Sequence, residues 1–183
     1  MFYALVHYPD IDIEPIKRFK RKYDPLADLI DPHMTLVFLV PESIGEQNLV
    51  SHIEQVLSRW QPFPIHLHGL EKSWDHWLFL VLQEGRGEVI KLHEELYAGV
   101  LEPYRRPDIQ FVPHIVLGLF VKQDEQYDIR NPQQTSFDAE RYEAALAEAE
   151  QLGLDYRCVV DRLHLVKINS DITQVVGSKE FAL

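Results

Sequence analysis

The spacing of hydrophobic and polar residues predicts a chain in which strands and helices are mixed. Apolar residues that run together or occupy every second position predict strands at residues 2–8, 33–40, 64–70, 76–83, 113–121, 156–167 and 171–176. Apolar residues three or four positions apart predict helices near residues 14–24, 43–60, 89–100 and 138–152. Ser43 and Glu46 form a capping-box pattern for the second helix, and Gly153 suits a left-handed cap after the last one.

The order of these elements repeats within the chain. Residues 31–38 read DPHMTLVF and residues 111–120 read FVPHIVLGLF, so that His33 and His114 each follow a proline at the start of an apolar strand. Each strand is followed by a helix and a hairpin, and the polar segment 122–137 lengthens the second half. Such a repeat predicts one unit, residues 1–183, made of two similar lobes about a pseudo-twofold axis, with both histidines facing one cleft.

The two histidine motifs carry the chemistry that the pattern favours. Side chains alternate across a strand, so His33 and Thr35 share one face, as do His114 and Val116. A half-buried structural histidine is the simplest interpretation of either motif alone, whereas the matched pair favours a function. Two imidazoles that face each other can act as base and acid on a phosphodiester, and a nearby hydroxyl can bind the non-bridging oxygens.

At these residues the chain resembles a known family. His33-Met-Thr35-Leu and His114-Ile-Val116-Leu resemble the paired His-x-Thr/Ser motifs of the two-histidine (2H) phosphoesterase superfamily, and especially its 2′-5′ RNA ligase-like / 2′,3′-cyclic phosphodiesterase branch. The resemblance covers nearly the whole chain. It implies a bilobal, duplicated α+β fold in which two antiparallel sheets, flanked by helices, enclose a central cleft.

The resemblance also implies an activity. The expected reaction is hydrolysis, or its reversal, of a 2′,3′-cyclic phosphate or a 2′-5′ phosphodiester in a nucleotide or an RNA end, without metal or cofactor. In the family pattern His114 is the base that activates water, His33 is the acid and Thr35 binds phosphate. The expected partner is a small nucleotide or RNA-end phosphate ester, in RNA processing, and the expected state is a monomer.

Val116 departs from the family pattern because it stands where the second Thr or Ser belongs. Loss of one hydrogen bond to a charged phosphate weakens the contact by about 1.5–3 kcal/mol. A slower enzyme or a changed substrate is therefore expected. Two alternatives stay open: a module that binds a nucleotide or RNA end without cleaving it, and a protein-interaction domain with an inactive cleft.

Other candidates have weaker support. Tyr104, Arg105 and Arg106 precede His114, and Arg suits phosphate while Tyr suits a base, so we predict that they bind substrate. The cluster KRFKRK at 17–22 is interpreted as the solvated side of a helix. The segment 122–137 leaves the far end of its strand and should not act as a lid.

His66 and His68 share one face of a predicted strand, a spacing that can chelate a metal ion. A third ligand is not placed by any recognisable motif, and His76 is the nearest option. A polar strand face is therefore the preferred interpretation, and no metal is expected.

The composition of the chain limits which classes of partner it can bind and which surroundings it suits. The 183 residues are 46% hydrophobic and carry 18 basic against 29 acidic side chains, for a formal charge of −11. This excess of acidic groups argues against an extended nucleic-acid groove. No apolar run approaches the roughly 20 residues of a membrane span. The single cysteine, Cys158, excludes an internal disulfide and fits a reducing cytoplasm.

Overall fold

The computed structural model describes residues 1–107, 109–122, 125, 127 and 135–183. The helical segments are α1 (Glu14–Tyr23), η1 (Glu42–Ile44), α2 (Glu46–Leu57), α3 (Arg86–Leu96), η2 (Gly99–Tyr104) and α4 (Ala139–Leu152). The strands are β1 (Phe2–His7), β2 (Met34–Pro41), β3 (Phe63–Lys72), β4 (Trp77–Glu84), β5 (His114–Leu119), β6 (Asp155–Val160), β7 (Arg162–Ile168) and β8 (Val175–Ala182). Within the described ranges, none of the helices has the length and apolar character that crossing a membrane requires.

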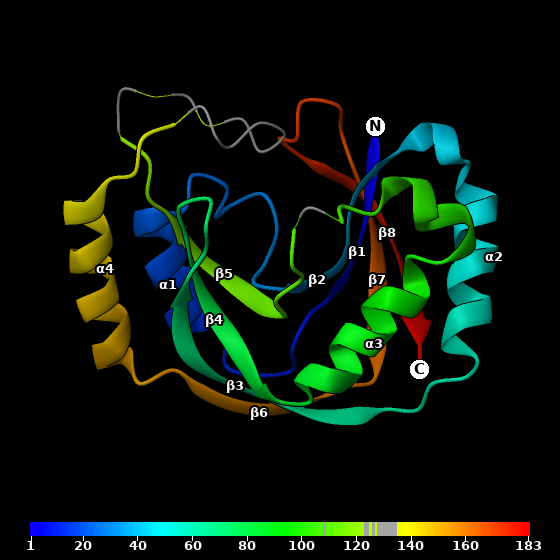
Figure 1. Cartoon of the computed structure of the whole chain (residues 1–183), viewed down its shortest axis with the longest axis horizontal. Helices are drawn as coiled ribbons and strands as arrows, with labels where there is room; N and C mark the ends of the chain where they lie inside the picture. Colours follow the sequence, from blue (N-terminus) through cyan, green and yellow to red (C-terminus); the bar gives the residue numbers. More distant parts are fainter. Residues whose placement is uncertain (108, 123–124, 126, 128–134) are drawn as a thin grey trace.

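In the described part of the chain these strands form one antiparallel sheet in the order β6-β3-β4-β5-β2-β1-β7-β8. The sheet has two halves that meet where β2 pairs with β5. Figure 1 shows α1 and α4 beside the half that contains β3–β6, and α2 and α3 beside the other half. The bilobal α+β fold expected from the sequence is therefore confirmed, with its two predicted sheets joined edge to edge.

Hydrophobic burial explains why the helices lie against the sheet. Ile16 and Phe19 lie on one side of α1 and are fully buried, as are Ile53 of α2 and Leu92 of α3. They belong to one large core cluster that also contains Leu80 and its neighbours on the central strands. Each buried side chain of this size contributes about 1.5–3 kcal/mol to folding. The core thus holds the two central strands in place from the helical side.

The structure corrects three of the predicted boundaries. Residues 156–167 form two strands, β6 and β7, which break at Asp161, and β8 runs on to Ala182. The break arises because β6 pairs with β3 in one half of the sheet and β7 pairs with β1 in the other. The third helix also ends earlier than predicted, at Leu96.

The two predicted helix caps have opposite outcomes. The capping box is wrong: Ser43 lies inside η1, and α2 begins after Gly45, whose φ is 81° and which makes no side-chain cap. The cap at Gly153 is confirmed by its left-handed φ of 59°. At the other end of α4, the Asp138 side chain accepts a hydrogen bond from the backbone N–H of Arg141.

Candidate active site

The candidate site lies where the two halves of the sheet join. Met34 of β2 lies opposite Ile115 of β5, and both side chains are buried in the core. Side chains alternate along a strand, so the residues on either side of this pair point to the opposite face of the sheet. These flanking side chains are half-buried, which leaves them accessible to a ligand.

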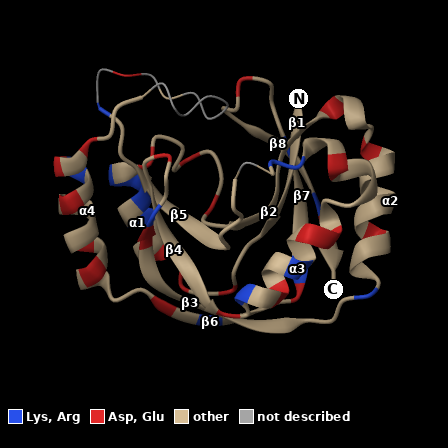
Figure 2. Ribbon diagram, viewed as in Figure 1, with Lys and Arg blue, Asp and Glu red and all other residues tan. Residues whose placement is uncertain are grey.

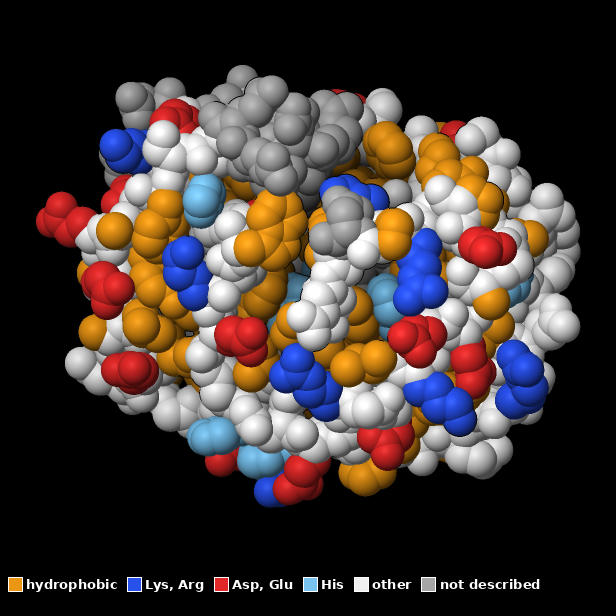
Figure 3. All heavy atoms as spheres, viewed as in Figure 1, with side chains coloured by type: hydrophobic (Ala, Val, Ile, Leu, Met, Phe, Trp, Pro, Cys, Tyr) orange, Lys and Arg blue, Asp and Glu red, His pale blue; other side chains and the backbone are white. Residues whose placement is uncertain are grey.

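Four side chains therefore form a square on that face. Continuing the antiparallel register by one residue each way puts Thr35 opposite His114 and His33 opposite Val116. His33 and His114 occupy one diagonal, and the Cα atoms of diagonal neighbours in such a pair lie about 7–8 Å apart. One phosphodiester can fit between two imidazoles at that spacing. Figure 3 shows a hollow near the centre of this view with histidine side chains inside it.

The two histidines have the same hydrogen bond in both halves. Nδ1 of His33 lies 2.7 Å from the carbonyl oxygen of Asp31, and Nδ1 of His114 lies 2.5 Å from that of Val112. A carbonyl oxygen only accepts, so Nδ1–H donates in each case and the ring orientation is fixed. Nε2 of each ring is then the atom that can take up a proton. Both histidines of the duplicated motif are therefore held in the same tautomer.

Burial lowers the pKa of His114 to about 4. Its ring stacks on Phe79 of β4 with the centroids 3.5 Å apart, so one face is covered by an apolar ring. Positive charge on His33 and on Lys20 lowers the pKa further. His114 is therefore neutral at pH 7, as a general base must be.

Burial also lowers the pKa of His33 to about 4, and the charges around it act in both directions. Its backbone hydrogen bond to Asp31 and the carboxylates of Asp24 and Asp31 act against the shift, whereas Lys20 adds to it. His114 has no such carboxylate among the causes of its shift. Of the two imidazoles, His33 is thus the one whose surroundings favour a proton.

Lys20 is a site residue that the sequence analysis missed. Its ammonium group is buried, pairs with Asp24 at 2.5 Å and donates to the carbonyl oxygen of Val116 at 3.2 Å. The interpretation of residues 17–22 as a solvated helix face is therefore wrong for Lys20. A lysine four residues before an aspartate at the end of a helix was the available signal, but its burial depends on β5, which lies about a hundred residues away.

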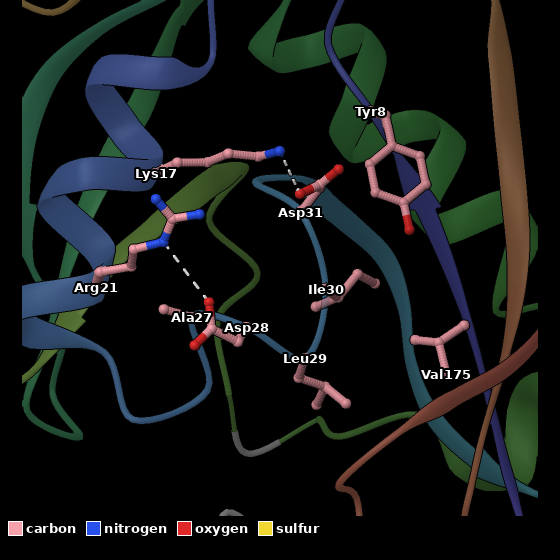
Figure 4. Close-up of a pocket in the computed structure, with 9 residues that line it drawn as sticks. All are labelled: Tyr8, Lys17, Arg21, Ala27, Asp28, Leu29, Ile30, Asp31 and Val175. Carbon is pink, nitrogen blue, oxygen red and sulfur yellow. Dashed lines mark ion pairs between the residues drawn. The ribbon is translucent and has the colours of Figure 1, made fainter.

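A cavity of about 340 Å³ is lined by Tyr8 and Asp31, two residues that contact His33. Tyr8, which lines it, meets the ring of His33 edge to face with the centroids 6.1 Å apart. In Figure 4 Lys17 and Arg21 extend from α1 toward the loop that follows it, where Lys17 pairs with Asp31 at 2.7 Å. The cavity thus combines an aromatic ring with two cations and with Asp28 and Asp31, the carboxylates that pair with them.

The predicted substrate-binding residues before His114 lie at the end of η2 and directly after it. Tyr104 is half-buried against the main core, and Arg105 is exposed with its guanidinium 3.9 Å from Glu94. Arg106 is exposed as well. In Figure 1 residues 109–113, which lead into β5, lie between the two halves of the sheet. Contact of these residues with a substrate stays a prediction.

The prediction that segment 122–137 stays clear of the cleft lies largely outside the described residues. Tyr127, which is described, accepts a hydrogen bond from Nε1 of Trp77 at 2.9 Å. It packs against the same small apolar cluster as Val116 and Phe79. This one residue of the segment therefore reaches the surroundings of the second motif.

The chain belongs to the 2′-5′ RNA ligase superfamily, whose family model matches residues 8–172. A predicted phosphoesterase from Bacillus licheniformis is 25% identical over 171 residues, which cover 91% of this chain and 89% of the relative. Another from Geobacillus thermodenitrificans is 26% identical over 132 residues, which cover 70% of this chain and 75% of the relative. The family that the sequence analysis suggested is thereby confirmed.

Solved structures share the fold. Apo LigT of Escherichia coli matches 100% of this chain and 95% of its own, with a TM-score of 0.58 and 19% identity. Usb1 of Kluyveromyces marxianus matches 100% of this chain and 97% of its own, with a TM-score of 0.53 and 18% identity. At this level of identity the likeness concerns the fold.

Proposed function

We propose that the protein is a metal-independent phosphodiesterase that hydrolyses a 2′,3′-cyclic phosphate or a 2′-5′ phosphodiester in a nucleotide or an RNA end. The observation that carries this proposal is the diagonal placement of His33 and His114 on β2 and β5, with Nδ1 of each held by a backbone carbonyl. Each ring then offers Nε2 for proton transfer, and membership of the 2′-5′ RNA ligase superfamily supports the reaction class.

In the proposed mechanism Nε2 of His114 removes a proton from water, and the oxygen of that water attacks phosphorus. The P–O bond to the ribose oxygen breaks, and protonated His33 gives its proton to the leaving oxygen. This assignment rests on the contrast in their surroundings: His114 is covered by Phe79, whereas His33 lies near two carboxylates. The hydroxyl of Thr35, which shares their face of the sheet, binds a non-bridging oxygen.

The charge distribution and the cavity favour a small anionic ligand. Figure 2 shows basic residues on α1, whereas α2 and α4 carry acidic ones. Lys17 and Arg21 of α1 line the cavity together with Tyr8, and an anionic ligand there would compete with Asp31 and Asp28 for the two cations. LigT, which shares this fold, has been crystallised with 3′-AMP and with NADP+. A nucleotide or RNA end held in the cavity would present its phosphate to the histidines.

The pH optimum should lie on the acid side. kcat/KM reports the free protein, in which one histidine must be protonated and the other neutral. Both pKa values are about 4, so this form is most abundant near that pH and becomes rarer as pH rises. We expect a bell-shaped kcat/KM profile with its maximum well below 6.5. The profile of kcat should peak at higher pH, because the bound anionic phosphate favours an imidazolium.

The stability of the folded protein limits the pH range in which the kcat/KM and kcat profiles can be measured. Each histidine has a lower pKa in the folded protein than its ordinary value of 6.5, so its contribution to stability is complete above pH 6.5. That contribution is lost as pH falls from 6.5 toward 4. Melting curves over this interval identify the pH values at which the protein stays folded. A kcat/KM maximum at or above pH 7 would contradict the burial of both imidazoles.

Val116 provides a test of the second motif. Val116→Thr changes a methyl group to a hydroxyl at nearly constant volume, at the position in β5 that corresponds to Thr35 in β2. We expect turnover or phosphate binding to improve by roughly tenfold, the low end of a charge-assisted hydrogen bond. Thr35→Val is the matched reverse variant and should weaken the same property. Steady-state kinetics and inorganic phosphate titrations measure both.

Val116 also packs against the apolar cluster that contains Trp77 and Leu119, and this contact favours the opposite outcome. An added hydroxyl without a partner there would cost about 1–3 kcal/mol of stability. A lower melting temperature of Val116→Thr with no gain in activity would therefore show that residue 116 does not face the phosphate.

The absence of a hydroxyl at Val116 also favours a second candidate, a module that binds a nucleotide or RNA end without cleaving it. A panel of 2′,3′-cyclic nucleotides, 2′-5′ dinucleotides and RNA ends with cyclic phosphates separates the two functions. We expect turnover of at least one of them. Binding without turnover across the panel would select the binding module, and neither binding nor turnover would select the interaction domain.

A further inference from the structure

A cluster of metal-binding side chains lies at the edge of the sheet, outside the histidine square. His68 of β3 lies opposite Asp155 of β6, and His66 is two residues away on the same strand face. Nε2 of His66 lies 2.7 Å from Oδ1 of Asp155, and Nδ1 of His68 lies 3.6 Å from Oδ2. One ligand atom from each residue lies within 4.8 Å of the other two.

We propose that His66, His68 and Asp155 bind a divalent transition-metal ion of the zinc class. Two imidazole nitrogens and one carboxylate are the ligands that such ions prefer, and they form a three-residue face with further coordination positions open to solvent. The carboxylate already lies against both rings, so a metal ion would replace hydrogen-bonding contacts that converge on one point. His68 and Asp155 are both more than half exposed, which gives the ion a route in.

A second layer of contacts supports the arrangement. Ligating histidines usually have a carboxylate near their other ring nitrogen, which orients the ring and raises its basicity. Nδ1 of His66 lies 4.0 Å from Oε1 of Glu84, and Glu84 is held by Arg157 at 2.7 Å. His66 is only 11% exposed, so its ring is also held by packing. The inner histidine thus has a supporting carboxylate.

The cluster is separate from the candidate active site. β4 lies between β3 and β5 in the sheet, so the cluster and His114 stand two strands apart. In Figure 1 β3 and β6 form the lower margin of the molecule, below the junction of β2 and β5. A metal ion here would tie β6, the edge strand, to β3. Its role would be to stabilise the pairing of β3 with β6, and hydrolysis in the cleft would not depend on it.

The third ligand of this cluster was not identified in the sequence analysis. His76 was the nearest option along the chain, but its Nε2 lies 3.0 Å from the carbonyl oxygen of Thr135, near the turn of the β3–β4 hairpin. Asp155 lies 87 residues after His68 in the chain. It reaches the histidines because β6 pairs with β3.

Calorimetric titration of ZnCl₂ into the full-length protein, stripped of metal and held at neutral pH, tests the proposal. We expect one ion per chain and a higher melting temperature with zinc. His68→Ala and Asp155→Asn should each weaken binding by at least roughly tenfold, since even the loss of a supporting group costs that much. Co²⁺ gives a second readout, with visible bands but no thiolate charge-transfer band, because Cys158 points to the other face of β6.

Glu180→Gln is the matched control. Glu180 of β8 lies opposite His164 at the other edge of the sheet, with 3.9 Å between the carboxylate and the ring, but among the described residues it belongs to no group of three potential metal ligands. This variant should bind zinc as the wild type does. Failure of the wild type to bind, or unchanged binding by both cluster variants, would overturn the proposal. Because the readout is metal binding, the result does not depend on what the cleft hydrolyses.

Discussion

Replacing either His33 or His114 by alanine is expected to lower kcat for the substrate by about 10²- to 10⁴-fold, the usual contribution of one acid or base. The two losses should not add in the double variant, because base and acid act in the same step. Alanine removes Nε2, the atom that takes up or gives the proton, from a ring whose other nitrogen is bound by a backbone carbonyl. Steady-state kinetics measure the effect.

His68→Ala is the control for these variants, since it removes a strand histidine outside the square. It should keep wild-type turnover. Melting curves must accompany the kinetics, because His114 stacks on Phe79 and its removal leaves space beside that ring. If either active-site variant stayed folded and kept turnover within threefold of the wild type, the acid–base mechanism would be wrong.

Asp24→Asn is expected to destabilise the protein by about 3–5 kcal/mol, because it leaves the ammonium group of Lys20 buried without its carboxylate. The two side chains are only 6% and 3% exposed, and they lie 2.5 Å apart. Asp24 also accepts a hydrogen bond from the backbone N–H of Leu26, which asparagine can still accept. The expected loss therefore reflects the charge. Chemical denaturation measures it.

Two controls sharpen this prediction. Lys20→Met removes the stranded charge, so the double variant Lys20→Met/Asp24→Asn should be more stable than Asp24→Asn alone. The pair of Lys22 and Glu148 also involves α1 but is more exposed, at 59% and 34%, and Glu148→Gln should therefore cost much less than Asp24→Asn. Equal losses for Asp24→Asn and Glu148→Gln would contradict the burial of the first pair.

The sequence predicted the features that depend on local pattern. The strands around His33 and His114 begin within a residue of their expected positions, because apolar alternation and the preceding prolines are local signals. The left-handed residue at Gly153 follows from its missing side chain in the same way. The duplication of the histidine motif then predicted that both histidines would face one cleft, although it predicted neither the pairing of β2 with β5 nor the carbonyl contacts that fix the tautomers.

Features that depend on distant partners could not be predicted. The break at Asp161 exists because the strands on its two sides join different halves of the sheet. The sequence around Lys20 is that of a basic helix, and the burial of this lysine depends on β5, where the carbonyl oxygen of Val116 accepts its hydrogen bond. Asp155 is the first residue of a strand, and its contact with the two histidines depends on the pairing of β6 with β3. In each case the chemistry is set by a neighbour that no local pattern identifies.

Turnover of 2′,3′-cyclic nucleotides and 2′-5′ dinucleotides by metal-stripped protein, in excess EDTA, tests the central claim most directly. We predict that the wild type converts at least one of them to a phosphomonoester or a cleaved dinucleotide at a rate that EDTA does not change. The double variant His33→Ala/His114→Ala should bind the same compound without converting it. Conversion that stops with EDTA and returns with zinc, or conversion that survives the loss of both histidines, would contradict the account.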